Sequence, residues 1–154
     1  MDHFAFYKSE IGTIKIGYDH ECVFLLKIAD KEDTANEPSK LSDEAFRQFA
    51  EYLDGKRRKF TFPYKPRGTY FQNKVWNALK DIPYGTTKTY KEIAAIIGNS
   101  GASRAVGAAN RANPIWIVIP CHRVIGSDGS LSGYAGGTAM KRKLIELEKK
   151  NGTV

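Results

Sequence analysis

The chain has 154 residues, 42% of them apolar, and its 24 basic and 17 acidic side chains give a net charge of +7. This length fits one ordinary domain or two small ones that share an interface, and the mixture of charged and apolar residues argues against disorder. A stretch of about 18 apolar residues is absent, which excludes a membrane-spanning helix. Residues 1–4 resemble neither a signal peptide nor a basic presequence, so we expect a cytoplasmic protein.

Charge is divided unevenly along the sequence. Residues 1–54 contain 12 acidic and 6 basic side chains, whereas residues 55–154 contain 5 acidic and 18 basic ones. The basic second part suits a polyanionic partner such as nucleic acid. A solvated basic face without a partner explains the charge alone equally well.

The first part of the chain predicts a small sheet. Residues 4–7 are apolar, residues 13–18 alternate with a period of two, and residues 22–26 form a continuous apolar run, so three strands are expected. Residues 30–39 are polar and predict a loop.

One helix follows the predicted sheet. Ser42 is a candidate N-cap, and the apolar residues after it have helical spacing: Phe46, Phe49 and Leu53. Two prolines between residues 63 and 67 indicate a boundary. We therefore expect a sheet-plus-helix domain over residues 1–65 and a second domain over residues 66–154.

The second domain is predicted to be mainly helical, which makes the fold class α+β. An apolar stripe predicts a first helix, with Phe71, Val75, Trp76 and Leu79 on one face. Thr89 and Glu92 form a capping box at the start of the next helix, and Gly98 suits its C-terminal end. Ser100 is a candidate cap for a helix through Arg111, which Pro114 prevents from continuing.

Three further elements complete the chain. Residues 115–119 are predicted to form a buried extended run that leads directly to Cys121. Residues 130–137 are rich in glycine and predict a loop, and residues 138–150 predict a final amphipathic helix.

The helices over residues 89–98 and 101–111 have the outline of a helix-turn-helix. The second is rich in small residues, including Ala105 and Gly107, which allow a helix to approach a groove closely. Glycine inside a helix costs about 1 kcal/mol relative to alanine, so a close approach is expected at Gly107. An ordinary helical hairpin is the alternative, and from this pattern alone it is the commoner arrangement.

Cys121 is a candidate nucleophile. It is flanked by His122 and Arg123, and nearby cations lower the pKa of a thiol. Adjacent residues of an extended chain point to opposite sides, so His122 needs a bend or a bridging water to take the thiol proton. Either Glu146 or Glu148 on the last helix could orient the imidazole. A buried structural cysteine is the alternative for Cys121.

The remaining cysteine and histidines do not suggest a metal site. Cys22 has no adjacent basic residue and is expected in the core. His3, His20, Cys22 and His122 lack the paired spacing of a zinc motif. We expect neither a metal nor a cofactor.

Several motifs together resemble the O6-alkylguanine-DNA alkyltransferase family, also called methylated-DNA–protein-cysteine methyltransferases. Its signature resembles Ile119-Pro120-Cys121-His122-Arg123-Val124. Surrounding motifs lie, in chain order, at residues 68–76, 82–85, 89–90, 103–107, 110–114 and 133–137. The resemblance covers roughly residues 66–150, and as a set it is specific.

The resemblance implies a role for each active-site residue. Cys121 would accept the alkyl group, His122 would deprotonate it through a water, and Glu148 would orient the imidazole. Tyr134 would donate a hydrogen bond to the damaged base, and Asn113 would hold the structure around the cysteine. A thioether is stable, so the protein would act once and be consumed.

The resemblance also implies double-stranded DNA containing O6-alkylguanine as the partner, with O4-alkylthymine left open, and a monomeric protein that does not bind membranes. Arg104 would replace the extruded nucleotide in the base stack, and Tyr90 would help to turn its phosphate. The helix-turn-helix would dock in the minor groove, and the other expected DNA contacts are Ala105, Gly107, Arg111 and Arg123.

Two departures and two alternatives accompany this reading. Tyr70 stands where the family often has proline, and Ala135 stands where some members have serine. A non-catalytic relative that only recognises alkylated DNA would lack the cysteine, so Cys121 argues against it. A cysteine hydrolase usually draws its histidine from a distant point of the sequence and would leave Arg104 unexplained.

Overall fold

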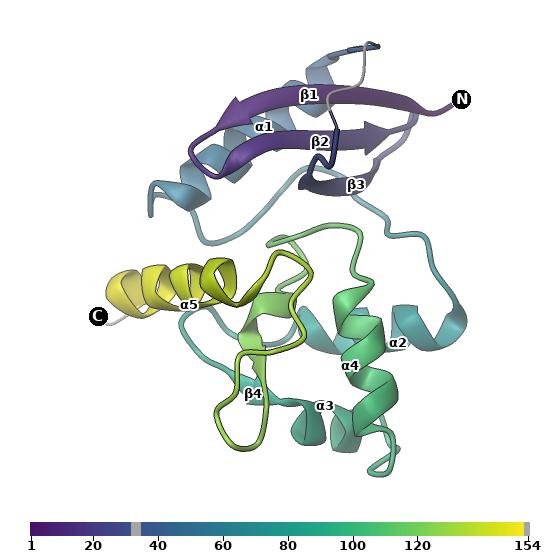
Figure 1. The fold of residues 1–154 in the computed structure, drawn as a ribbon. Helices are drawn as coiled ribbons and strands as arrows, with labels where there is room; N and C mark the ends of the chain where they lie inside the picture. Colours follow the sequence, from purple (N-terminus) through teal and green to yellow (C-terminus); the bar gives the residue numbers. More distant parts are fainter. Residues whose placement is uncertain (32–34, 153–154) are drawn as a thin grey trace. The chain divides into compact units, whose positions relative to one another are not determined.

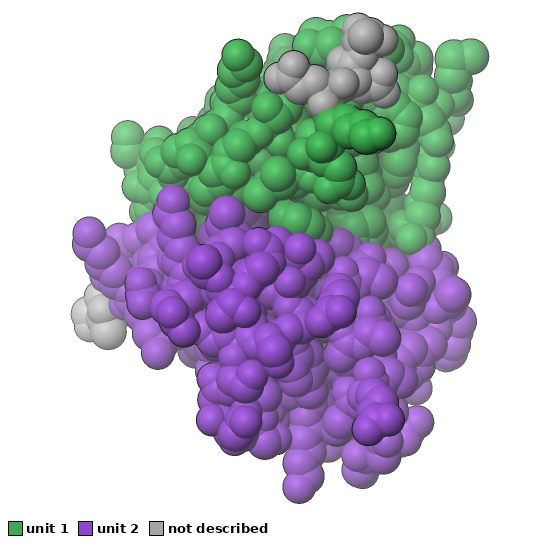
Figure 2. Space-filling view, in the orientation of Figure 1, with its two compact units in different colours: residues 1–67, 114–116 green, residues 68–113, 117–154 purple. Residues whose placement is uncertain are grey.

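The computed structural model describes residues 1–31 and 35–152, and the chain divides into two compact units (Figures 1 and 2). One unit contains residues 1–67 and 114–116, and the other contains the rest. The division near residue 67 lies close to the boundary expected after residue 65, but the sequence did not indicate that residues 114–116 join the first unit.

The first unit is built on an antiparallel sheet of three strands, β1 (His3–Ser9), β2 (Gly12–Tyr18) and β3 (Val23–Ile28). All three predicted strands are therefore present. Ala5 pairs with Ile16, and both are fully buried on the face that α1 covers in Figure 1. The outer edge of β3 is covered as well, because Leu26 exchanges backbone hydrogen bonds of 2.8 Å with Pro114 and Trp116.

Helix α1 (Lys40–Leu53) has its N-cap three residues before the predicted one. Its N-cap is Ser39, whose hydroxyl accepts from the backbone N–H of Ser42, while the Ser42 hydroxyl accepts from the backbone N–H of Ser39. Ser42 is thus the third helical residue of a capping box, in a place more often held by glutamate or glutamine. The predicted loop contains no helix or strand over residues 30–31 and 35–39, and residues 32–34 lie outside the described chain.

The second unit contains four helices among its described residues: α2 (Tyr70–Leu79), α3 (Tyr90–Ile96), α4 (Ser103–Arg111) and α5 (Thr138–Gly152). A two-residue strand β4 (Lys88–Thr89) runs parallel to β5 (Val124–Ile125). The Thr89–Glu92 capping box and the left-handed Gly98, with φ +82°, are confirmed. Trp76 fixes α2 to α4, because its indole N–H donates to the carbonyl of Ala109 at 2.8 Å.

Two local predictions for this unit are wrong. Helix α4 begins at Ser103 after Ala102, which makes no side-chain cap, and Ser100 lies in the preceding turn. Residues 115–119 are not a continuous strand, since the chain turns at Ile117, whose φ is +73°. This turn coincides with the point at which the chain passes from one unit to the other.

None of the helices within residues 1–31 and 35–152 is both long enough and apolar enough to cross a membrane.

Candidate active site and nucleic-acid interface

Cys121 opens a single turn of 3₁₀ helix, η1 (Cys121–Arg123), and its side chain is only 1% exposed. Two asparagines at the end of α4 hold this turn. Asn110 donates its side-chain amide to the carbonyl of Cys121 at 3.2 Å, and Asn113 donates to the carbonyl of Ile119 at 2.8 Å. The turn supplies the bend that a straight strand before Cys121 lacks.

The Glu148 carboxylate on α5 forms hydrogen bonds with the other two side chains of η1, those of His122 and Arg123. Its Oε2 lies 2.6 Å from His122 Nε2 and accepts from Arg123 Nη2 at 2.9 Å. Its Oε1 accepts from Arg123 Nε at 2.7 Å and from the backbone N–H of Gly85 at 3.1 Å. The structure thus selects Glu148, which is 1% exposed, over Glu146, which is exposed.

This cluster fixes the protonation of its members. Burial by itself would raise the pKa of Glu148, but the hydrogen bonds from His122 and Arg123 and the charge of Arg123 hold that pKa well below its usual range. Burial lowers the pKa of His122, and the hydrogen bond to Glu148 offsets this only in part. A neutral imidazole that donates from Nε2 to a carboxylate keeps Nδ1 as its acceptor nitrogen.

The Cys121 thiol is shifted in the direction opposite to our expectation. Burial raises its pKa to about 11, and a hydrogen bond from Asn113 and the charge of Lys141 counter that rise only in part. The adjacent cations do not lower it as predicted, because Arg123 is matched to Glu148 and His122 is neutral. The resting sulfur is therefore a thiol, and a base must remove its proton before it can react.

Three polar side chains lie near enough to Cys121 to respond to a charge on its sulfur. A thiolate there raises the pKa of Tyr90, Tyr134 and Lys141. The Lys141 ammonium lies 3.4 Å from the hydroxyl of Tyr90 and 3.5 Å from the carbonyl of Ser132, and burial lowers its pKa to about 8.

The sequence analysis missed Lys141. It belongs to the run Lys141-Arg142-Lys143, which has the composition of a solvated face, yet it is fully buried. A signal was present in the spacing, because Lys141 shares a helical face with Leu144 and Glu148.

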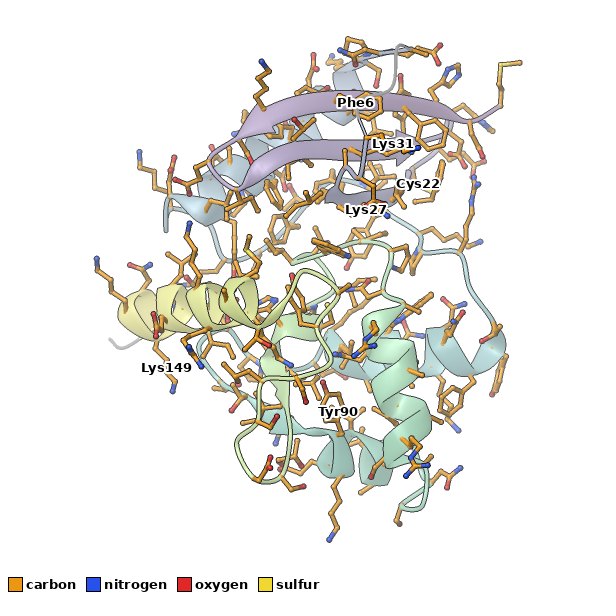
Figure 3. All side chains as sticks on the ribbon, viewed as in Figure 1. Phe6, Cys22, Lys27, Lys31, Tyr90 and Lys149 are labelled. Carbon is orange, nitrogen blue, oxygen red and sulfur yellow. The ribbon has the colours of Figure 1, made fainter. Side chains whose placement is uncertain are left out.

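A surface cavity of about 630 Å³ is lined in part by Tyr90 and Ser132, the two residues that the Lys141 ammonium contacts. Figure 3 shows Tyr90 between α4 and the loop that precedes α5, and the Tyr90 hydroxyl donates to the carbonyl of Ser132 at 3.0 Å. Gly133 is required here, because it has φ +88° and a Cβ on it would lie 2.8 Å from the Tyr90 oxygen. The cavity is lined by Tyr90, Ser103, Arg104, Gly107, Ala108, Arg111, Ser132 and Gly133.

Helix α4 presents most of its predicted DNA contacts to solvent. Arg104, Ala105 and Arg111 are exposed, and Gly107 is half-buried in the cavity wall. Arg123 does not join this face, since it is 7% exposed and its guanidinium is held by Glu148 and by the carbonyl of Ile82, at 2.7 Å from Nη1. Arg123 is therefore an internal residue and not a DNA contact.

Cys22, the other cysteine singled out in the sequence, is not a member of this site. Cys22 belongs to the first unit and is partly exposed, so the expectation that it lies in the core is wrong. In the described parts of the chain, no group of three or more histidine, cysteine, aspartate or glutamate side chains could hold a metal ion.

A buried thiol, an adjacent histidine–carboxylate pair and a cavity walled by a basic helix define a DNA-binding protein with a nucleophilic cysteine. The sequence profile of the 6-O-methylguanine DNA methyltransferase DNA-binding domain matches residues 70–150. A methylated-DNA–protein-cysteine methyltransferase of Methanosarcina acetivorans is 46% identical over 152 residues, which cover 95% of this chain and 97% of the relative. The chain belongs to this family of methyltransferases.

Solved structures agree with the family assignment. The crystal structure of the Mycobacterium tuberculosis O6-methylguanine methyltransferase has a TM-score of 0.90 at 40% identity and covers all of this chain and 96% of that one. A structure of the M. tuberculosis protein OGT in complex with DNA has a TM-score of 0.88 at 42% identity and covers 97% of this chain and 94% of that one.

Proposed function

We propose that this protein repairs O6-alkylguanine in double-stranded DNA by direct reversal, with Cys121 as the acceptor of the alkyl group. The observation that carries the proposal is the arrangement at η1. A buried thiol follows Pro120 in a tight turn, and the next side chain is a neutral imidazole held by Glu148 at 2.6 Å. Such a nucleophile with an oriented base is the constellation that covalent transfer requires.

The target nucleotide must leave the duplex to reach Cys121. The alkyl carbon lies inside the base stack, and extruding the nucleotide costs about a few kcal/mol in lost stacking. The cavity between α4 and Tyr90 is the space for the extruded nucleotide, and Arg104 on the exposed face of α4 can enter the vacated stack. Tyr90 and Arg111, which line the same cavity, are placed to contact the phosphates on either side.

The transfer itself moves one proton and one alkyl group. His122 Nδ1 takes the thiol proton through a bridging water, and Glu148 stabilises the imidazolium that forms. The thiolate sulfur attacks the alkyl carbon, a C–S bond forms, the bond from that carbon to O6 breaks, and its electron pair stays on guanine. Tyr134, buried near the sulfur, donates a hydrogen bond to the departing base.

The product explains why the reaction occurs once. A thioether resists hydrolysis, so Cys121 is not regenerated and each molecule removes one alkyl group without a cofactor. We further propose that the protein acts as a monomer in a reducing compartment such as the cytoplasm, where the free Cys121 thiol persists.

The decisive experiment is intact-protein mass spectrometry after mixing with a duplex that carries one O6-methylguanine. We expect a stoichiometric mass gain of one methylene equivalent that maps to Cys121. Cys121→Ala should show no gain and keep its affinity for DNA. Tight binding without a mass gain in the native protein would instead support recognition without repair, and a duplex without the lesion is the control.

A further inference from the structure

Arg123 has an unusual position for a charged residue, because its side chain lies in the interior of the second unit. It is 7% exposed, and its guanidinium donates to both oxygens of Glu148, at 2.7 and 2.9 Å, and to the carbonyl of Ile82. It also lies over the ring of Tyr84, 5.6 Å from the centroid. Burying a guanidinium this thoroughly lowers the stability of the fold unless an opposite charge and hydrogen bonds compensate it.

We propose that Arg123 is a positioning residue that keeps His122 neutral, and so able to accept the Cys121 proton, by matching the charge of Glu148. This inference rests on the proposed function, in which His122 is the base. The carboxylate of Glu148 is buried and needs a cationic partner. Arg123 supplies that cation permanently, whereas His122 could supply it only by becoming an imidazolium.

An imidazolium at rest would stop the reaction. The added proton would occupy Nδ1, because Nε2 already bonds to Glu148 at 2.6 Å. His122 would then have no lone pair with which to take the thiol proton, and the thiol, whose pKa is about 11, would stay protonated at neutral pH. The activity of Cys121 therefore depends on which cation compensates Glu148.

The charges that face His122 shift its pKa in opposite directions. Glu148 on α5 raises the pKa of His122 through its hydrogen bond and charge, while Arg123 and Lys141, also on α5, lower it. Lys141 is not the partner of the carboxylate, since its ammonium lies against Tyr90 and Ser132. Without Arg123, only burial and Lys141 would oppose the rise that Glu148 causes in the pKa of His122.

The geometry also explains why this residue is arginine. A guanidinium binds both oxygens of a carboxylate in one plane, which fixes the rotation of the carboxylate as well as its charge. The Nε and Nη2 atoms of Arg123 hold Oε1 and Oε2 of Glu148 in this manner, so that Oε2 meets His122 Nε2. A lysine would supply the charge without fixing this orientation.

Two measurements on Arg123→Gln and Arg123→Lys test the inference. The first is the rate constant of alkyl transfer to the full-length protein as a function of pH, with an O6-methylguanine duplex. For Arg123→Gln we expect the acid limb to move up by about one pH unit or more, which is about a tenfold loss of rate on that limb. The rate on the alkaline plateau should change much less, and Arg123→Lys should restore part of the shift.

The second measurement is the ¹⁵N NMR titration of the histidine ring nitrogens, without DNA. The chain has three histidines, and the partly exposed His3 and the exposed His20 serve as internal references. His122 should stay neutral to a lower pH in the native protein than in Arg123→Gln. Arg67→Gln is a matched control, because Arg67 also holds a carboxylate with two nitrogens, that of Asp2 at 2.9 and 3.0 Å.

The outcomes separate this inference from the proposed function. Equal loss of rate at every pH, with an unchanged His122 titration, would make Arg123 merely structural and overturn the inference. A shifted titration in a protein that transfers no alkyl group would leave the role of Arg123 standing and remove the function. If Arg123→Gln does not fold, Arg123→Lys decides the matter: a loss of rate that is equal at every pH, with an unchanged His122 titration, overturns the inference.

Discussion

Cys121 combines two properties that oppose each other. Its burial holds the sulfur as a thiol, with a pKa of about 11, yet its function requires a thiolate. A protonated, 1% exposed thiol reacts slowly with oxidants, which matters for a residue that each molecule can use only once. In the proposed function, the neighbouring His122 resolves the conflict, because it would remove the proton for the transfer while the resting sulfur stays a thiol.

We predict that Arg104→Ala slows alkyl transfer on duplex DNA by about tenfold or more, while transfer from a free modified base changes little. The exposed Arg104 side chain is on the wall of the cavity, and in the proposed function it would compensate for the stacking that is lost when a nucleotide leaves the duplex. Arg142→Ala, which removes an exposed arginine of α5, is the matched control. Equal losses on both substrates would show that Arg104 does not assist extrusion.

We predict that Lys141→Met stabilises the protein and slows alkyl transfer. The lowered pKa of Lys141, about 8, shows that burial disfavours its charge. An apolar replacement of similar size is therefore expected to raise the free energy of unfolding by about 1–2 kcal/mol. It also removes the cation that stabilises a thiolate at Cys121. Urea unfolding measures the gain in stability, and single-turnover kinetics measures the slower transfer. Faster transfer in Lys141→Met would contradict the role of the cation.

Helix α4 contains a glycine that the packing of the protein itself does not explain. A Cβ on Gly107 would meet only the ring of Tyr90, at an ordinary distance of 3.9 Å, so the protein's own packing does not require glycine there. Glycine nevertheless destabilises a helix interior by about 1 kcal/mol relative to alanine. The space that Gly107 leaves open faces the cavity.

Gly107→Ala should therefore raise stability by about 0.5–1 kcal/mol and reduce transfer on duplex DNA. The reduction follows because the added methyl narrows the cavity beside Tyr90. Thermal unfolding and transfer kinetics measure the two effects, and Ala139→Ser, at an exposed position of α5 that does not line the cavity, provides a control for changes of surface. Increased stability with unchanged transfer would show that no ligand approaches Gly107.

Most elements could be predicted because their signals are local. The period-two pattern of residues 13–18 and the capping box of Thr89 and Glu92 each depend on a few adjacent residues. The errors arose where distant contacts decide the structure. Residues 115–119 are apolar enough for a strand, but the chain turns at Ile117 after Ile115 has paired with Leu26 of β3.

The candidate site shows the same limit. The motif around Cys121 indicated the nucleophile and the base, but charge in sequence did not reveal that Arg123 is matched to a carboxylate 25 residues away. The basic run 141–143 also hid the burial of Lys141, which only its helical spacing with Leu144 and Glu148 indicates. Whether a charge meets solvent or a partner depends on tertiary packing, and the direction of the Cys121 pKa shift follows from that packing.

At the scale of the whole molecule, the basic charge belongs to the part that carries α3 and α4. Lys88, Lys91, Arg104 and Arg111 are all on or beside the helix pair. We predict that DNA binding weakens with salt and that Lys91→Ala reduces the slope of log K against log salt by about one. Binding titrations at several salt concentrations measure the slope, with Lys8→Ala on β1 as the control. An unchanged slope would place Lys91 away from the phosphates.

The stability of the protein should fall in mild acid because of the cluster that activates Cys121. The pKa of His122 is lowered from its ordinary 6.5, so below about that pH the unfolded chain binds a proton that the folded protein does not. Glu148, whose pKa is also lowered, adds a second loss only at pH values below its ordinary 4.5. Lys141, whose pKa is lowered to about 8, causes a loss mainly above that pH, so the loss in mild acid is due mainly to His122.

We predict that the free energy of unfolding falls by about 1 kcal/mol between about pH 7.5 and about pH 5.5, measured by urea denaturation. His122→Gln should flatten this dependence, since glutamine does not titrate, whereas His20→Gln, at a highly exposed histidine, should leave it unchanged. An equal slope in His122→Gln and the native protein would mean that folding does not depress the pKa of His122. The loss of stability in acid and the proposed activation of Cys121 would then have separate origins. A flattened slope would instead assign the loss of stability to His122, the proposed base.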